Sequence, residues 1–398
     1  MLREVLQGLH VLEVGRFISG PFCARLLADC GAQVIKVEPP ACGDPARAMG
    51  PFLGDKPHPE RSGLFLYVNT NKRGITLDLS RPQGAALFRR LARDADILVD
   101  NMPAGTLESW GLGYDGLRRL NPALIVVSIT DFGLSGPHKG FKGSQLVHAA
   151  MGGWMSSNVM DTRAPVRPGG WVIHYVAGVA AALGAMTAVF HRDITGEGIV
   201  VELSQQEVML EVGSAQFTAQ MHTGVGVTRS PGSLGFPGLL PCRDGWVGLN
   251  AMSFRNWANL CKLVGHPELS EEPDLARMAG RQARAAELTA MVLPWSESRG
   301  KWEILMDGLK QGATVGFVAT TEDIANFPIH EERGFFVEVA HPEMGKVKLP
   351  GPPFRLGAGA PHTSPTPAPT LGQHNNEVYQ EAGLSQEEVE AMAQEGTI

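Results

Sequence analysis

The sequence lacks the short motifs that identify several large classes of metal-binding, redox and nucleotide-binding proteins. Its five cysteines show no CxxC spacing and its twelve histidines form no HxxxH cluster, so we expect reduced thiols and no metal site. GxGxxG is also absent, since the glycines of the first turn stand at Gly15 and Gly20. A nicotinamide-dependent oxidoreductase, which places its pyrophosphate on such a turn, is therefore only an alternative.

An excess of positive charge and a long hydrophobic run are missing as well. The 34 basic residues are outnumbered by 41 acidic ones, with a net charge of −7, which argues against a nucleic-acid partner. No apolar run approaches the roughly 20 residues that cross a bilayer. The first residues, MLREVLQGLHVLEV, contain no apolar signal core. We therefore expect a soluble cytoplasmic protein with no membrane partner.

Strand-like and helical patterns alternate along the first half of the chain. The apolar, β-branched segments are typical of buried strands, and the segments between them have helical spacing. Such alternation predicts an α/β fold, with a parallel sheet covered by helices on both faces. The expected strands are 10–14, 33–38, 96–99, 124–129 and one from residue 199, and the expected helices are 21–30, 81–94 and the buried, Ala-rich 175–191.

The composition changes twice further along the 398-residue chain, which is long enough for two domains. From about residue 223 glycine and proline become frequent, and short strands and helices continue to about residue 327. Residues 350–369 are Pro-rich and without helical periodicity, and Ser385 is a plausible N-cap for a last helix. We expect three parts: residues 1–222 of a large domain, a small domain at 223–327, and a connector with a C-terminal return at 328–398.

Several blocks of sequence, in this order, resemble the family III CoA-transferases (CaiB/BaiF type). They include LQGLHVLEVGRFISGPFCARLLADCGAQVIKVEPP from residue 6, NTNKRGITLDL from residue 69, ADILVDNMPAGTLESWGLGYDGLRRLNPALIVVSITDFGLSGP from residue 95 and HRDITGEGIVVELSQQE from residue 191. PGPPFRLG from residue 350 and the segment from residue 368 complete the series. The resemblance implies a Rossmann-like large domain built from both chain ends, a smaller middle domain, and two subunits that interlock like links of a chain.

The resemblance also implies a mechanism for which this sequence lacks the central residue. In the family an aspartate attacks the donor thioester and later holds CoA as an enzyme thioester. His174, four residues before Gly178, stands at that position, and Gln145 in GSQLVHAAMGG matches a second acid. Asp161 and Asp131 are the nearest other acids that could act as the nucleophile, and His148 is expected to pack in or near the core.

The CoA-binding residues implied by the resemblance are also altered. Pro39 and Ser109 stand where the family often has cations, which would meet the CoA phosphates through charge-assisted bonds. The remaining candidates for CoA contacts are Lys72, Arg73, Asn101, Lys142 and Arg47. The segment SPGSLGFPG, with Gly232, Gly235 and Gly238, matches a mobile loop over the active site in the family, although an ordinary interdomain loop explains it as well.

These features predict a subunit of a heteromeric CoA-transferase that lacks the nucleophile. It would move CoA between a succinyl-CoA-like thioester and a (di)carboxylic acid, with a paralogous subunit supplying the aspartate and with acyl-CoA as substrate rather than a permanently bound cofactor. The family includes a two-subunit succinyl-CoA:(R)-benzylsuccinate CoA-transferase, and Phe17, Trp154 and Trp171 suit an apolar acceptor, although core packing explains them equally. The alternative within the same fold is a 2-methylacyl-CoA racemase-like enzyme, whose acid–histidine pair is not reproduced here.

Overall fold

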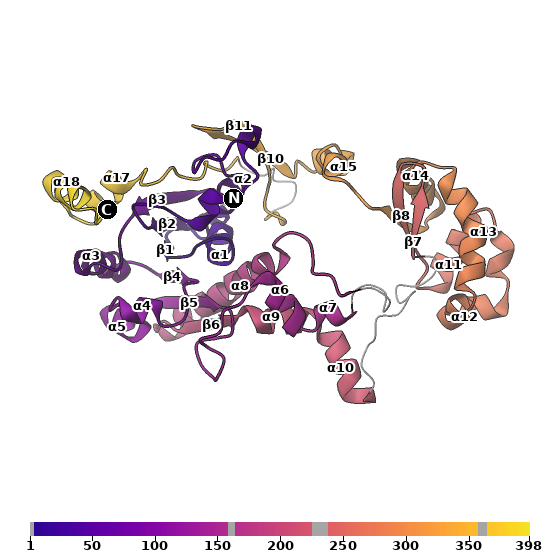
Figure 1. The fold of residues 1–398 in the computed structure, drawn as a ribbon, viewed down its shortest axis with the longest axis horizontal. Coiled ribbons are helices and arrows are strands. Elements are labelled where there is room, and N and C mark those ends of the chain that lie inside the picture. Colours follow the sequence, from indigo (N-terminus) through magenta and orange to yellow (C-terminus); the bar gives the residue numbers. More distant parts are fainter. Residues whose placement is uncertain (1–3, 158–163, 225–237, 357–363) are drawn as a thin grey trace. The chain divides into compact units, whose positions relative to one another are not determined.

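The computed structural model describes residues 4–157, 164–224, 238–356 and 364–398, which form two compact units (Figure 1). The larger unit combines Met1–Ser157, Val166–Val227 and Glu331–Ile398, so both ends of the chain contribute to it. The smaller unit is formed mainly by Thr228–His330.

A six-stranded parallel sheet forms the centre of the larger unit. Its order is β3-β2-β1-β4-β5-β6, which is the order of a doubly wound dinucleotide-binding sheet with its switch point between β1 and β4. The expected α/β fold with a parallel sheet is confirmed, and the strand at 33–38 has the predicted bounds. The strands are β1 (His10–Glu13), β2 (Gln33–Glu38), β3 (Lys72–Thr76), β4 (Ile97–Asp100), β5 (Ile125–Thr130) and β6 (Val200–Ser204).

Helices cover both faces of this sheet because successive strand residues point to opposite sides. Val11 packs under α1 (Ser19–Asp29) and α8 (Val172–Thr195), whereas Leu12 packs under α3 (Pro82–Arg93) and α5 (Tyr114–Leu120). The C-terminal helices α17 (Asn375–Glu381) and α18 (Gln386–Gln394) return to the second face. Tyr379 on α17 donates its hydroxyl to the carbonyl of Thr76 on β3. Ser385 caps α18 as predicted.

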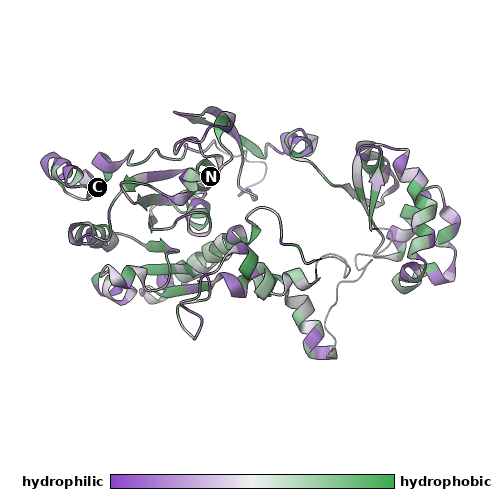
Figure 2. Ribbon diagram, in the orientation of Figure 1, coloured by the Kyte–Doolittle hydropathy of each residue, from purple (hydrophilic) through white to green (hydrophobic). Residues whose placement is uncertain are grey.

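The long helix α8 is buried on one face only, which corrects the expectation of a fully buried helix at 175–191. Its buried side carries small residues, including Ala177, Ala181 and Ala185, which let the helix approach α1 and β5 closely. Its other side exposes apolar residues, and Figure 2 shows apolar colouring over much of the ribbon. By length and composition alone α8 could span a membrane, but its alanine face belongs to the core of the larger unit.

The smaller unit pairs an antiparallel sheet with helices. The sheet order is β7-β8-β9, formed by Gly238–Cys242, Gly245–Asn250 and Thr314–Phe317. Trp257 and Ile304 lie in its core. Its helices include α11 (Phe254–Leu263), α12 (Met278–Ala283), α13 (Ala285–Glu297), α14 (Lys301–Gln311) and α15 (Thr321–Ala325).

The remaining elements of the larger unit are short. A hairpin of β10 (Phe336–His341) and β11 (Gly345–Pro350) packs on α2 (Gly63–Asn69) through a shared apolar cluster. The other helices of the larger unit are α4 (Thr106–Ser109), α6 (Gln145–Met151), α7 (Trp154–Ser157), α9 (Gln205–Val212) and α10 (Ser214–Thr223). Helix α16 (Pro328–Glu332) lies at the end of the smaller unit.

Buried ion pairs tie β1, β2 and β3 together by joining Glu13, the last residue of β1, to Lys36 within β2 and to Lys72, the first residue of β3. The fully buried Glu13 accepts from Lys36 Nζ at 3.0 Å and from Lys72 Nζ at 2.7 Å. Lys36 also donates to Asp44 at 2.7 Å and to the carbonyl of Gly15 at 2.8 Å. Burial, together with the nearby charge of Lys36, lowers the pKa of Lys72 to about 8 despite its ion pair with Glu13. The carboxylates of Asp44 and Glu13 more than offset burial for Lys36 and raise its pKa.

We predict that Glu13→Gln destabilises the protein by about 3–5 kcal/mol, because Lys72 would keep only neutral acceptors, Asn69 and the carbonyl of Pro21. Denaturant unfolding measures the loss. The loss should shrink as pH rises towards about 8, the depressed pKa of Lys72 in the native protein, because above it neither folded form buries a charged Lys72.

The matched control is Glu343→Gln. Glu343 pairs with Arg61 at 3.4 Å, and the two side chains are 43% and 37% exposed, so its loss should change stability by no more than about 1 kcal/mol. Equal effects of the two substitutions would show that the buried network does not hold the sheet.

Candidate active site

The turn after β1 places an aromatic ring beside His174. Phe17 has a positive φ of 66°, a strained conformation for a bulky residue. Its backbone N–H donates to Asp44 Oδ1 at 2.8 Å, and Asn101 bonds both the N–H and the carbonyl of Arg16 at 2.8 Å. The buried ion network thus fixes the turn, which explains how the strained backbone is maintained.

His174 lies in the first turn of α8, between aromatic rings and a polar chain. The ring centroid of Phe17 is 5.4 Å away and that of Trp171 is 5.9 Å away. Nδ1 of His174 lies 2.7 Å from Gln205 Oε1. Gln205 is the first residue of α9, directly after β6, so two elements that end or begin at the carboxyl edge of the sheet meet here. Gln205 was not predicted as a site residue, although its place directly after a strand was a usable signal.

Asp131 continues this polar chain at the end of β5. Its Oδ1 accepts from Gln205 Nε2 at 3.3 Å and from His148 Nε2 at 3.0 Å, and its Oδ2 accepts from the backbone N–H of Gly143 at 2.7 Å. The structure therefore connects three residues of the sequence analysis. Gln205 bonds both His174 and Asp131, and Asp131 bonds His148. His148 is buried, as predicted.

The charges in this chain follow from its contacts. Burial raises the pKa of Asp131, but hydrogen bonds from His148 and Gly143 more than offset it, so the pKa lies below its ordinary value. Burial lowers the pKa of His174, against the opposing effect of its bond to Gln205. The ground state at neutral pH is accordingly an aspartate and a neutral His174 imidazole.

Gln145 lies outside the polar chain and faces backbone carbonyls. It is the first residue of α6, and its Nε2 donates to the carbonyls of Gly170 and Pro168. A carboxylate at this position would face the same two carbonyls without a hydrogen to donate. The local backbone therefore suits the neutral amide that the sequence has.

Most of the residues predicted to contact CoA take part in interactions within the larger unit. Lys72 bonds Glu13, and Arg47 bonds Glu38 and Glu60. Arg73 pairs with Glu377 and Glu381 of α17, Asn101 holds the turn after β1, and Lys142 is exposed before α6. Their contact with CoA remains a prediction, and the structure shows that all except Lys142 have other partners.

A cavity of about 300 Å³ opens at the carboxyl ends of β1 to β4. Pro39 and Trp110 line it, as do the carboxylates of Glu38, Asp44 and Asp78, with Arg16 as the basic lining residue. This is the edge where doubly wound sheets bind ligands. Glu38 and Asp44 are already paired with Arg47 and Lys36, so the described lining offers a phosphate one cation, Arg16.

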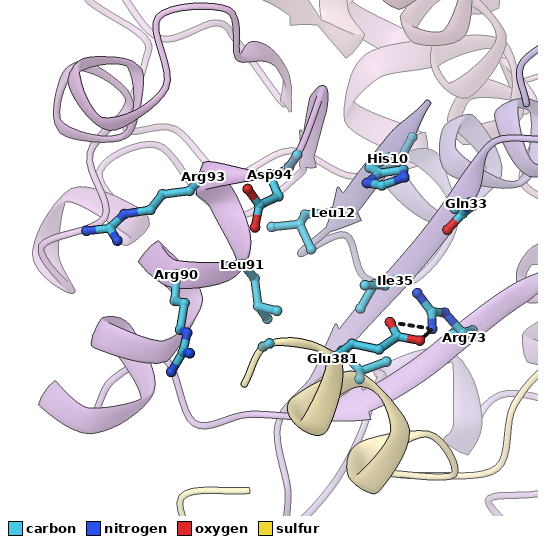
Figure 3. A pocket seen from close by; sticks show the side chains of 14 residues that line it. His10, Leu12, Gln33, Ile35, Arg73, Arg90, Leu91, Arg93, Asp94 and Glu381 are labelled. Atoms are coloured by element: carbon cyan, nitrogen blue, oxygen red, sulfur yellow. Dashed lines mark hydrogen bonds and ion pairs between the residues drawn. The ribbon is translucent and has the colours of Figure 1, made fainter. Parts of the chain in front are cut away.

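A second cavity, of about 510 Å³, lies between α3 and α17, on the sheet face that carries Leu12 and Ile35 (Figure 3). Arg73 and its partner Glu381 lie next to each other at one side of it. It is lined by the first residues of β1 and β2, His10 and Gln33, and so lies towards the opposite edge of the sheet from His174.

The structure describes some of the remaining predicted residues and leaves others outside the described ranges. Gly232, Gly235 and Asp161 lie outside the described residues, and Gly238 is the first residue of β7. Trp171 and Phe17 pack together, whereas Trp154 packs with Ile173 and Met209. Among the residues that the structure describes, no three His, Cys, Asp or Glu side chains gather as metal ligands.

The chain belongs to the family III CoA-transferases: residues 6–375 match the family described as CoA-transferase family III. It is 33% identical to the succinyl-CoA–D-citramalate CoA-transferase of Chloroflexus aurantiacus over 96% of each chain. It is 30% identical, again over 96% of each chain, to the beta subunit of the succinyl-CoA–L-malate CoA-transferase of the same organism. A crystal structure of a CAIB/BAIF family protein from Brucella suis matches with a TM-score of 0.83 and 28% identity, over 95% of this chain and 99% of that one.

We predict that Gln205→Glu raises the pKa of His174, because a carboxylate would then accept from Nδ1–H and stabilise the imidazolium by about one pKa unit or more. Nitrogen-detected NMR titration of histidine-labelled protein measures this value. Gln205→Leu, which removes the acceptor, should lower the pKa further. His191 is exposed on the same helix, so His191→Ala identifies the His191 resonance by its loss and should leave the His174 titration unchanged. Identical titration curves for the three Gln205 forms would contradict the contact.

Proposed function

We propose that this chain is the subunit of a heteromeric family III CoA-transferase that lacks the nucleophile. The enzyme would move CoA between a succinyl-CoA-like thioester and a (di)carboxylic acid, as the names of its relatives suggest. The observation that carries this proposal is the imidazole of His174, whose Nδ1 is committed to Gln205.

The chemistry of transfer explains why this residue matters. A carboxylate nucleophile forms a mixed anhydride with the acyl group as the C–S bond breaks, and the CoA thiolate then attacks the enzyme's own acyl carbon. The donor acid leaves, and CoA stays on the enzyme as a thioester. An imidazole has no acyl carbon, so His174 can accept an acyl group but can never carry CoA in this way.

Asp131 does not replace the missing nucleophile in this proposal. Both of its oxygens accept hydrogen bonds, from Gln205, His148 and the N–H of Gly143. These bonds stabilise the carboxylate, hold its pKa low and make its oxygens weaker nucleophiles. We therefore assign the transfer step to a partner.

The exposed side of α8 supports the proposal that this chain binds a partner subunit. Val179, Leu183, Phe190 and Ile194 recur at helical spacing and are 52%, 70%, 68% and 70% exposed. A contiguous apolar stripe of this kind marks an association surface. The occupant we propose is a paralogue that carries the aspartate, in an interlocked pair. The name of one relative, the beta subunit of a succinyl-CoA–L-malate CoA-transferase, supports this proposal.

Within this proposal the acceptor acid is apolar. Phe17 and Trp171 meet edge to face, with their centroids 4.8 Å apart, beside His174, which suits a phenyl or alkyl group. A succinyl-CoA:(R)-benzylsuccinate CoA-transferase is the specific activity we favour.

We predict that this chain alone shows no CoA exchange between succinyl-CoA and benzylsuccinate, and that co-expression with the paralogue gives a defined heteromer that does. Replacing the partner's aspartate by asparagine should abolish exchange. His174→Ala in this chain should reduce exchange by less than about threefold, since no covalent step uses this imidazole. Exchange is followed by chromatography of the CoA esters.

Leu183→Glu tests the assembly, because it places a charge in the apolar stripe and should prevent the heteromer from forming. The control is Lys310→Glu on α14, whose side chain is 72% exposed and pairs with its neighbour Asp307. A stable homodimer of this chain with normal exchange, inactivated by His174→Ala, would overturn the proposal.

We also predict weak CoA binding by this subunit, with a Kd above about 10 μM by calorimetry, because Arg16 is the one basic residue among the described residues that line its cavity at the sheet edge. Pro39→Arg should tighten binding about tenfold or more, since one charge-assisted phosphate contact contributes about 1.5–3 kcal/mol. Pro57→Arg adds the same charge at an exposed position outside the cavity. A Kd improved equally by both would mean that only net charge matters.

A further inference from the structure

The polar chain at His174 fixes which nitrogen of the imidazole carries the hydrogen. Asp131 is a carboxylate that can only accept, so Gln205 must turn its amide nitrogen towards it. The amide oxygen of Gln205 then faces Nδ1 of His174 at 2.7 Å and requires a hydrogen there. The lone pair of the neutral ring is consequently on Nε2.

Nε2 is the end of the chain that faces away from these contacts. No described residue hydrogen-bonds to it, and the ring lies between Phe17 and Trp171. An oriented imidazole whose other nitrogen is held by a polar chain ending in a carboxylate is the arrangement of a general base. In nucleophile–base pairs the base contacts a side-chain hydroxyl or thiol, but here the described residues supply none at Nε2.

We propose that His174 acts as a general base that activates water for hydrolysis of an acyl-CoA thioester bound to this subunit. Gln205 and Asp131 act as positioning residues. The identity of the thioester rests on the proposed function, but the hydrolytic step does not require the partner's aspartate. The subunit would thus have an activity of its own.

In the hydrolytic step, Nε2 takes a proton from water while the water oxygen bonds to the thioester carbonyl carbon. The tetrahedral intermediate then collapses, the C–S bond breaks, and the imidazolium returns the proton to the departing sulfur. The products are a carboxylic acid and CoA thiol, with no oxidant or metal required. Asp131 stabilises the transient imidazolium through Gln205.

The charged groups around the ring determine the pH dependence. The charges of Asp131, at the end of β5, and of His148, on α6, act on the His174 ring. The residues that contact the ring from the turn after β1 and from α9 are the neutral Phe17 and Gln205. Hydrolysis should rise with pH as His174 loses its proton. This rise should lie below the ordinary histidine range because burial lowers the pKa of His174.

The experiment uses the full chain, alone and co-expressed with its paralogue, with succinyl-CoA and phenylacetyl-CoA in ¹⁸O-labelled water without an acceptor acid. We expect CoA release and one ¹⁸O atom in the product acid. His174→Gln should reduce the rate at least about a hundredfold, and His191→Ala should leave it unchanged. Loss of the partner's aspartate should leave hydrolysis intact.

The positioning residues are tested by the pH profile rather than by loss alone. Gln205→Glu should keep most of kcat but move the rise in activity to higher pH, because it raises the pKa of the base. Gln205→Leu and Asp131→Asn should lower kcat about tenfold with KM changed less than about twofold. A profile that does not move in Gln205→Glu would overturn the assigned roles.

The outcomes separate this inference from the proposed function. Exchange by the heteromer without hydrolysis overturns the inference alone, and hydrolysis without exchange in any heteromer overturns the proposed function alone. In a parallel reaction in D₂O, deuterium entering the acyl α-carbon without CoA release would mean that His174 removes a carbon-bound proton instead, and would overturn hydrolysis.

Discussion

The fold of the larger unit depends on one buried carboxylate that holds two ammonium groups. Glu13 ends β1, and its partners Lys36 and Lys72 come from β2 and β3. Charges this deeply buried persist only when each has a partner. Through Asp44 the same network fixes the turn that carries Phe17. The position of Phe17 beside His174 is therefore fixed by electrostatics at the sheet edge.

The site around His174 is polar and ordered. Asp131, Gln205 and His174 form a continuous hydrogen-bonded chain. Beside it, Nδ1 of His148 and Oε1 of Gln145 are buried without a partner among the described residues. The chain presents a neutral, oriented imidazole.

Helix α8 combines several of these constraints in one element. Its first turn carries His174, its alanine side packs on α1 and the sheet, and its apolar outer side is exposed. Movement of the helix would change all three at once. We infer that association along the outer side would also stabilise the position of His174.

The sequence by itself determined the sheet and its class, because buried β-branched runs such as 33–38 and the helices between them follow periodicity, which is a local property. The strand β3 was not predicted, since KRGIT contains two cations and a glycine that only the pairing of Lys72 with Glu13 and the close approach of Pro369 to Gly74 explain. The absence of an aspartate at 174 was likewise visible in the sequence. Only the tertiary structure could show that Gln205 bonds His174 and Asp131, and that Lys72 and Arg47 are bound by carboxylates, because these contacts join residues far apart in the chain.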